Sequence, residues 1–398
     1  MFDHLQIHDT RERLIVGVAD AALAPLRWGR ARSVAGPVGR VLLLRLERIG
    51  DLLMVLDAIR DARAAWPHAE IDLAVGSWNA PVAALIPEVS RVEIADVPWL
   101  AREGRGDTWP ALVAKARRWR TRDYDVVVNF EPDIRSNFLA WLTGAPIRLG
   151  YSTGGGGAWL TDALEYEPAS HVAVNARQII ARAAGRAAPD QAGSGRWPQL
   201  VPPPDAVARA EALVGDAPRP LVGVHVSGGR ESKQWHLDRF AAVARELALT
   251  RGATIVLTGS DSDRPLVNQV ASQLGGLRVI DACGALDLPA LAALLARLDL
   301  LITGDTGPMH LASAMGTPLV ALFGPSNPAR YGPLGPGAHV IRIDLWCSPC
   351  GRVRLPPERC RGHVPDCLDG IDVARVVAAA LDQIDQIDGR GRRVPATT

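Results

Sequence analysis

Apolar residues in this chain form short, nearly uninterrupted runs that alternate with segments of helical periodicity. The first run is VLLLRL at 41–46, and residues 52–66 follow it with apolar side chains on one helical face. In the rest of this half, predicted strands at 71–76, 92–97 and 124–130 alternate with predicted helices at 109–119 and 136–144. Alternating apolar strands and amphipathic helices predict an α/β fold with a parallel sheet covered on both faces.

Residues 186–220 interrupt this alternation with proline-rich and Gly/Ser-rich stretches on either side of a short helical segment, which is typical of a linker. A second series follows, with predicted strands at 221–226, 254–259, 277–284, 299–304 and 318–324, and predicted helices at 237–249, 263–274, 288–297, 308–315 and 371–388. Two doubly wound halves predict a cleft between two domains, with ligands at the carboxyl ends of the strands.

The pattern therefore gives a domain organisation. We expect an N-terminal helical extension over 1–40, a Rossmann-like domain over 41–190, a linker over 191–220, a second Rossmann-like domain over 221–370, and a C-terminal helix and tail over 371–398.

The composition of the 398 residues is that of a globular protein, with 48% apolar and 22% charged residues. A formal net charge of +1 gives no reason to expect nucleic acid as a partner. No apolar run reaches the ~20 residues that span a bilayer, and we expect no secretory signal at the N-terminus.

The N-terminal segment is nevertheless amphipathic. Leu14 and Val18 recur at helical spacing, and Arg27, Arg30 and Arg32 follow them. Two interpretations stay open: a helix packed on its own domain, or a helix docked peripherally on the anionic inner face of a membrane.

Four of the five cysteines lie close together, with the spacing C-x2-C-x9-C-x6-C at Cys347, Cys350, Cys360 and Cys367. Four thiols can hold a structural zinc or iron ion, and free buried thiols or a disulfide are the alternatives. Cys283 stands alone and is predicted to be a small core residue. So few cysteines in a long chain favour a reducing, cytoplasmic compartment.

The strand ends of the second half carry residues suited to binding phosphate. In HVSGGRESK (225–233), Ser227, Gly228 and Gly229 allow close backbone approach, and Lys233 supplies a positive charge. The turn FGPSNP at 323–328 is similar in character. Neither the dinucleotide-binding fingerprint nor the Walker A loop is present at these turns.

A third turn, ITGDTGPMH at 302–310, places backbone amides at a predicted helix start, where the helix dipole favours an anion. Asp305 has two interpretations, a helix N-cap or a ligand contact. Thr306 and Gly307 begin the helix, and His310 lies on the same face one turn later. Together with Lys233, these residues predict a diphosphate site.

Asp51 follows Gly50 after the first strand and starts a helix. It is either a helix cap or a carboxylate that takes a proton from an attacking hydroxyl group.

Four separated segments resemble glycosyltransferase family 9, the ADP-heptose:lipopolysaccharide heptosyltransferases. They are RIGDLLMVLDAIRDARAAWPHAEI, SGGRESKQWHLDRF, TGSDSDR and DTGPMHLASAMGTPLVALFGPSNPARYGP, and the likeness runs from about residue 41 to residue 385. The resemblance implies a GT-B fold of two Rossmann-like domains, with donor bound mainly by the second and acceptor by the first. It also implies inverting transfer without a catalytic metal or other cofactor. Many members carry a similar Cys-rich segment.

The resemblance also implies roles for single residues. Asp51 matches the general base, Lys233 the lysine that neutralises donor phosphate, and Asp305 an acid that contacts the donor sugar. Thr306 and Gly307 match the phosphate cradle, with His310 close by. Asp261 or Asp263 stands where the family often has an acid on the nucleotide ribose, and the sequence leaves open which of the two it is.

We therefore expect a cytoplasmic, inverting glycosyltransferase that moves a sugar, heptose in the first instance, from an ADP-activated donor to an acceptor hydroxyl. The acceptor would be lipopolysaccharide core or another glycan or lipid-linked acceptor. The alternatives are a nucleotide-sugar epimerase on the same fold and a non-catalytic sugar-nucleotide-binding protein.

Overall fold

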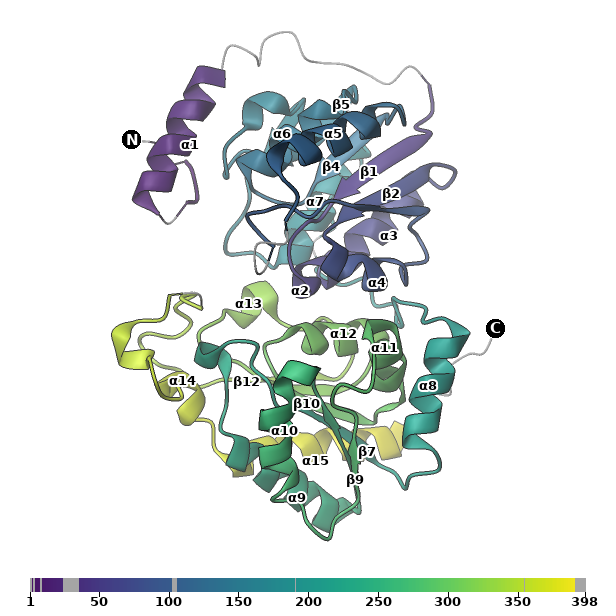
Figure 1. Cartoon of the computed structure of the whole chain (residues 1–398), viewed down its shortest axis with the longest axis vertical. Coiled ribbons are helices and arrows are strands. Elements are labelled where there is room, and N and C mark those ends of the chain that lie inside the picture. The colour runs from purple at the N-terminus through teal and green to yellow at the C-terminus, as the bar shows by residue number, and fades with distance from the viewer. Residues whose placement is uncertain are drawn as a thin grey trace. The chain divides into compact units, whose positions relative to one another are not determined.

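The computed structural model describes residues 2, 4–7, 9–23, 36–101, 106–189, 191–353 and 355–390, with side chains described to residue 386. The chain divides into two compact units, Met1–Ser194 and Gly195–Thr398 (Figure 1). Each unit is built on a six-stranded parallel sheet, so the predicted α/β fold with two doubly wound sheets is confirmed. Arg27, Arg30 and Arg32 lie outside the described residues.

The first unit has the strand order β3-β2-β1-β4-β5-β6. Its strands are β1 (Arg40–Leu44), β2 (Glu70–Val75), β3 (Arg91–Ile94), β4 (Val126–Asn129), β5 (Ile147–Tyr151) and β6 (Asp162–Leu164). Its α-helices are α1 (Thr10–Leu23), α2 (Ile49–Leu53), α3 (Leu56–Ala65), α4 (Ala80–Ala83), α5 (Trp109–Arg120), α6 (Ile134–Leu142) and α7 (Val172–Ala183). Helix α3 packs against α7, and α5 packs against α6.

Strand β1 lies at the centre of this sheet, between β2 and β4. Val41, Leu42, Leu43 and Leu44 are fully buried, because helices cover both faces of a parallel sheet and leave no polar side for alternation. The predicted helix over 52–66 is wrong in one detail, since the chain breaks it at Met54 and Val55 into α2 and α3. The sequence pattern also missed β5, β6 and α7, whose apolar runs are short or polar at their edges.

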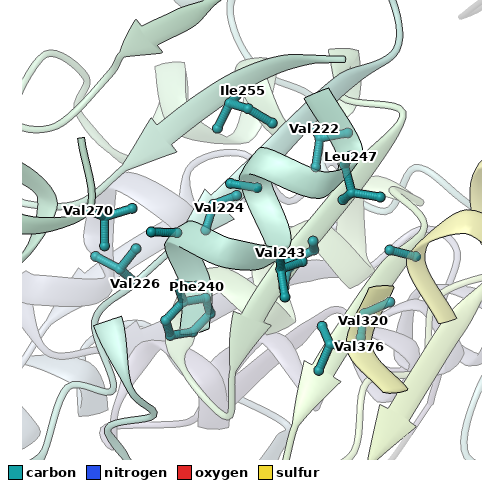
Figure 2. Close-up of a cluster of buried hydrophobic side chains, with 14 of the residues drawn as sticks. Val222, Val224, Val226, Phe240, Val243, Leu247, Ile255, Val270, Val320 and Val376 are labelled. Carbon is teal, nitrogen blue, oxygen red and sulfur yellow. The ribbon is translucent and has the colours of Figure 1, made fainter. Parts of the chain in front are cut away.

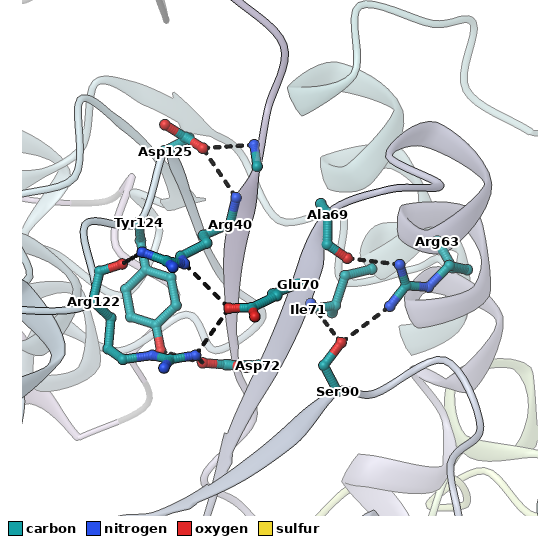
Figure 3. A network of polar contacts seen from close by, with 11 residues as sticks. Arg40, Arg63, Ala69, Glu70, Ile71, Asp72, Ser90, Arg122, Tyr124 and Asp125 are labelled. Carbon is teal, nitrogen blue, oxygen red and sulfur yellow. Dashed lines mark hydrogen bonds and ion pairs between the residues drawn. The ribbon is translucent and has the colours of Figure 1, made fainter.

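A polar network closes the amino ends of β1 and β2 (Figure 3). Asp72, fully buried, accepts hydrogen bonds from the Tyr124 hydroxyl at 2.7 Å and from Arg122 at 3.1 Å. Asp125 accepts the backbone N–H of Gly39 at 2.7 Å. Burial and the hydrogen bond to Asp72 raise the pKa of Tyr124. This network lies at the opposite end of the strands from Asp51.

Helix α1 packs on the Gly-rich segment 152–157. Asp20 accepts the backbone N–H of Gly156 at 2.9 Å, and a Cβ at Gly155 would lie 2.4 Å from Val16. Residues 153–158 are buried. The other face of α1 exposes Leu14, Ile15 and Val18 by 54%, 70% and 57%. No helix among the described residues is both long and apolar enough to cross a membrane.

The second unit has the strand order β12-β11-β10-β7-β8-β9. Its strands are β7 (Leu221–His225), β8 (Thr254–Thr258), β9 (Val279–Asp281), β10 (Leu300–Gly304), β11 (Leu319–Leu322) and β12 (Ala338–Ile341). Its α-helices are α8 (Pro204–Val214), α9 (Leu237–Arg251), α10 (Arg264–Ala271), α11 (Leu288–Arg297), α12 (Gly307–Met315), α13 (Pro328–Tyr331), α14 (Asp366–Asp369) and α15 (Val373–Arg390).

Helices α9, α10 and α15 cover one face of this sheet. Figure 2 shows their side chains, among them Phe240, Val243 and Leu247, packed on strand residues such as Val222 and Val224. Helix α8, from the segment predicted as a linker, packs against α11. A rigid sheet thus supports the loops at its carboxyl edge.

Candidate active site

The carboxyl ends of β7, β8, β10 and β11 lie at one edge of the second sheet, because these strands are parallel. The loops that leave this edge are 226–233, 259–263, 305–306 and 323–327. They contain every donor-site residue predicted from the sequence in this half except Gly307 and His310, which lie in the first turn of α12.

Lys233 and Asp305 meet at this edge, with 2.8 Å between Lys233 Nζ and Asp305 Oδ2. Their side chains are only 19% and 10% exposed, respectively. Gly228 lets the loop fold back tightly, since a Cβ there would lie 2.6 Å from the Lys233 backbone. Gly229 adopts a left-handed φ of 65° just beyond it. The glycines therefore shape the loop that carries the lysine.

Asp305 is not the helix cap. Thr306 is the N-cap of α12, and the Asp305 carboxylate is turned to Lys233 instead. The cap interpretation of Asp305 is therefore wrong. The amides at the start of α12 have no partners within the helix and can bind an anion. His310 is buried in the first turns of the same helix.

The two acidic residues after β8 have different surroundings. Ser260 donates from its backbone N–H at 2.8 Å and from its hydroxyl at 2.6 Å to Asp263, which also accepts from Ser227. Burial opposes ionisation of Asp263, but these hydrogen bonds outweigh it and lower its pKa. The Asp261 side chain is exposed and faces Gly284.

His225, the last residue of β7, is buried beneath these loops, and its Nδ1 lies 3.2 Å from the Thr258 hydroxyl. Burial lowers the pKa of His225 to about 4, although the charge of Asp263 opposes this shift. A neutral imidazole is therefore part of the floor of the site.

The Cys-rich segment packs on two of the donor-site loops. Ser348 Oγ donates to the Gly324 carbonyl at 2.8 Å, and Gly351 N donates to Pro325 O at 2.8 Å. Ser232, beside Lys233, donates to the Val353 carbonyl at 3.1 Å. The segment thus supports the loop that carries Lys233.

The cysteines Cys347, Cys350, Cys360 and Cys367 line one cavity together with Ser232 and Pro325. All are free thiols, and burial together with the neighbouring thiols raises the pKa of Cys367 to about 11. Within the described part of the chain, no His, Cys, Asp or Glu cluster has an arrangement that could hold a metal ion. The donor set suits zinc or iron, but its arrangement gives the predicted metal no support.

In the first unit, Asp51 occupies the third position of α2, and its carboxylate accepts the Arg48 backbone N–H at 3.1 Å. Arg45 Nη2 lies 3.6 Å from Asp51 Oδ1, and Arg45 Nη1 lies 2.7 Å from Glu47 Oε2. The Asp51 side chain is 28% exposed. It therefore caps its helix and still presents a carboxylate to solvent.

Two pairs of tryptophan and arginine lie at the carboxyl edge of the first sheet, the edge that also carries Asp51. Arg48 lies over the Trp78 ring at 5.9 Å, and the Trp78 indole donates to the Glu47 carbonyl at 2.8 Å. Arg135 lies over Trp99 at 4.7 Å. The sequence interpretation missed these residues, although each follows a predicted strand of the first half.

Comparison with known proteins now decides the family. The sequence model of glycosyltransferase family 9 (heptosyltransferase) matches residues 113–357, more than half of the chain. The chain belongs to glycosyltransferase family 9. It is 28% identical over 319 residues to lipopolysaccharide heptosyltransferase 2 of Salmonella typhimurium, which covers 76% of this chain and 88% of the relative.

Solved structures agree with this family assignment. A family 9 glycosyltransferase from Veillonella parvula has a TM-score of 0.74 at 25% identity, covering 89% of this chain and 99% of that one. The ADP-heptose lps heptosyltransferase II of E. coli has a TM-score of 0.70 at 22% identity, covering 88% and 99%. The fold of this transferase is therefore the predicted GT-B fold.

Proposed function

We propose that this glycosyltransferase moves heptose from ADP-heptose to a hydroxyl of lipopolysaccharide core or a related glycan, with inversion at the anomeric carbon. Its family and the names of its relatives support this reaction. The observation that carries the proposal is the Lys233–Asp305 pair beside the start of α12, at the carboxyl edge of the second sheet.

This edge suits a nucleoside diphosphate. As the bond from the anomeric carbon to the diphosphate breaks, negative charge grows on the leaving oxygen. Lys233 and the free amides of Thr306 and Gly307 stabilise that charge, so the site needs no catalytic metal. Asp305 holds the lysine before the donor arrives and contacts the donor sugar afterwards.

Asp261 is the acid that we assign to the nucleotide ribose. Asp263 is held by Ser260 and Ser227, so its carboxylate is committed to shaping the loop. Asp261 is exposed at the same edge, and its carboxylate can accept hydrogen bonds from the two ribose hydroxyls.

Asp51 is the general base in this proposal. It takes the proton from the acceptor hydroxyl as that oxygen attacks the anomeric carbon from the face opposite the diphosphate. Trp78 and Trp99 hold Arg48 and Arg135 at this edge, and the two guanidinium groups supply positive charge for an acidic substituent of the acceptor. We expect Trp99→Ala to raise the KM for acceptor and leave that for donor unchanged.

The test is transfer from ADP-heptose to a purified core acceptor by Asp51→Asn. We expect turnover to fall at least 100-fold with the donor Kd unchanged, about the contribution of a positioned base. Asp61→Asn is a matched control, since its side chain is 29% exposed and paired with Arg177 at 2.6 Å. Full turnover by Asp51→Asn would refute the base. If the wild type forms product from donor alone, the protein is an epimerase. If the wild type binds donor without turnover, the protein is non-catalytic.

We also propose that the enzyme works at the cytoplasmic face of a membrane, with the exposed side of α1 against the lipid. The exposed Leu14, Ile15 and Val18 support the contact with lipid. The free cysteine thiols support a reducing, cytoplasmic compartment. Replacing all three by serine should abolish sedimentation with anionic vesicles. Leu249→Ser, at a residue 65% exposed, is the control that should not. Equal binding by both variants would refute the α1 contact.

A further inference from the structure

The loop that carries Asp51 is fastened to the end of the neighbouring strand, β4. Arg45, only 3% exposed, donates from Nη1 to the Phe130 carbonyl at 3.0 Å. The same guanidinium donates from Nε to the Asp51 carbonyl at 3.1 Å. Arg45 therefore ties the first turn of α2 to the chain that leaves β4.

Glu131 provides the second fastening. Its carboxyl group, in a residue 2% exposed, accepts the backbone N–H of Leu46, the residue after Arg45. Asn129 fixes Glu131 in turn: Glu131 N–H donates to Asn129 Oδ1 at 3.1 Å, and Asn129 Nδ2 donates to the Glu131 carbonyl at 3.0 Å. Asn137 holds that amide from α6 at 2.8 Å. Glu131 is thus rigidly placed beneath the loop of Asp51.

Three carboxyl groups surround one guanidinium here. Glu47 and Asp51 contact Arg45 directly, and Glu131 interacts with it electrostatically. Burial raises the pKa of Glu131 to about 8, the charge of Glu47 adds to this, and Arg45 opposes it. Asp133 also faces Glu131, while Tyr151 and Tyr166 face Arg45. The raised pKa favours the protonated form of Glu131 at neutral pH. The charge of Arg45 is then shared by the carboxylates of Glu47 and Asp51.

We propose that Glu131 is a positioning residue for the transfer: through Leu46 and Arg45 it sets the orientation of the Asp51 carboxylate and the share of the Arg45 charge that this carboxylate receives. This inference rests on the proposed role of Asp51 as base. When Glu131 loses its proton, a third negative charge competes for Arg45, and Asp51 receives less of its positive charge. A carboxylate that is less neutralised, at an unchanged position, removes the acceptor proton faster.

The experiment is the pH profile of kcat with saturating donor and acceptor. The wild-type rate should rise about two- to fivefold across an inflection near the pKa of Glu131. Glu131→Gln cannot ionise, and it should lose this inflection. At neutral pH, Glu131→Ala should lower kcat more than Glu131→Gln does, because glutamine can still accept from Leu46. Arg45→Lys should lower kcat at least tenfold, with the donor KM unchanged, because lysine cannot make the same fork of bonds.

Asp72→Asn is the matched control, since Asp72 is another buried carboxylate paired with arginine, at the far end of the same strands (Figure 3). It should lower the melting temperature and keep the wild-type pH profile. The inference is overturned if Glu131→Gln keeps the inflection, a result that decides even if Glu131→Ala fails to fold. If Asp51→Asn retains turnover, Asp51 is not the base. If Asp51→Asn is inactive but Glu131→Gln has the same pH profile as the wild type, only the role of Glu131 is rejected.

Discussion

Replacing Lys233 by methionine removes one of only two lysines among the 44 Lys and Arg residues of the chain. Methionine keeps the length of the side chain and deletes its charge. The lost partner leaves Asp305 with an unpaired carboxylate in a position only 10% exposed. The variant therefore tests the diphosphate site and the internal ion pair at once, and the two effects have to be separated.

The structure gives both magnitudes. With Nζ and Oδ2 2.8 Å apart, the Coulomb attraction is about 6 kcal/mol at an effective dielectric of about 20. Desolvation offsets most of it, so we expect Lys233→Met to lower the free energy of unfolding by about 1–3 kcal/mol. The loss at the transition state is that of one preorganised donor to a developing anion, about 3–4 kcal/mol, or a 100- to 1,000-fold fall in kcat.

Lys115→Met is the control for the ion pair. Lys115 Nζ lies 2.6 Å from Asp107 Oδ2, and the two side chains are 25% and 19% exposed, close to the values at Lys233. This variant should lose similar stability and keep kcat. Reductive methylation with ¹³C also gives two assignable lysine signals, of which only that of Lys233 should shift when ADP is added. The diphosphate role of Lys233 would be refuted if Lys233→Met lowered kcat less than threefold. It would also be refuted if Lys115→Met lowered kcat as much as Lys233→Met does.

Three further predictions follow from the second unit. Asp261→Asn should raise the donor KM about tenfold, because its charge-assisted hydrogen bonds to the ribose are weakened. This variant should also discriminate less against a donor that carries 2′-deoxyribose. Asp263→Asn should instead lower the melting temperature, and the opposite pair of results would exchange the roles of the two residues. Because burial lowers the pKa of His225 to about 4 from 6.5, the unfolded chain binds more protons between these values. The free energy of unfolding should therefore fall by up to about 3 kcal/mol as pH drops through this window, measured by denaturant titration, and His225→Gln should remove the dependence. Among the free thiols, exposed Cys350 should react fastest with a disulfide reagent and buried Cys283 slowest. Protection of Cys350 by added zinc would contradict the finding that the described residues hold no metal-binding arrangement.

Most of the strands and helices could be predicted because they depend on local patterns. Uninterrupted runs such as 41–46 and 221–226 mark strands buried on both faces, and periodic segments mark the helices that cover them. The turns with Gly228 and Gly307 could be located for the same reason, since a parallel sheet brings all its carboxyl ends to one edge. Asp305 was ambiguous because a cap and an ion-pair partner have the same sequence signature.

Contacts that depend on which strands are neighbours could not be predicted. Arg45 and Glu131 are far apart in sequence, and they meet only because β4 pairs with β1 on the side opposite β2. Arg45 and Glu131 each come directly after an apolar run. A polar residue after the run at 124–130 is therefore the same kind of sequence signal as Asp51 after the run at 41–46. The buried state of 153–158 was hidden similarly, because its glycines become close-packing positions only once α1 lies on them.

The two carboxylates of the proposed site, Asp51 and Asp305, are paired with cations of different character, and the difference matches what each cation must do. Arg45 donates in fixed directions to Phe130 and Asp51, so the planar guanidinium holds the base in one place. Lys233 makes a single ion pair with Asp305, and a flexible ammonium can turn from that carboxylate to a diphosphate without breaking a network. Arginine at position 233 would add bulk beside the loop that Gly228 keeps tight. We therefore expect Lys233→Arg to recover less than a tenth of the wild-type kcat, even though it keeps the charge.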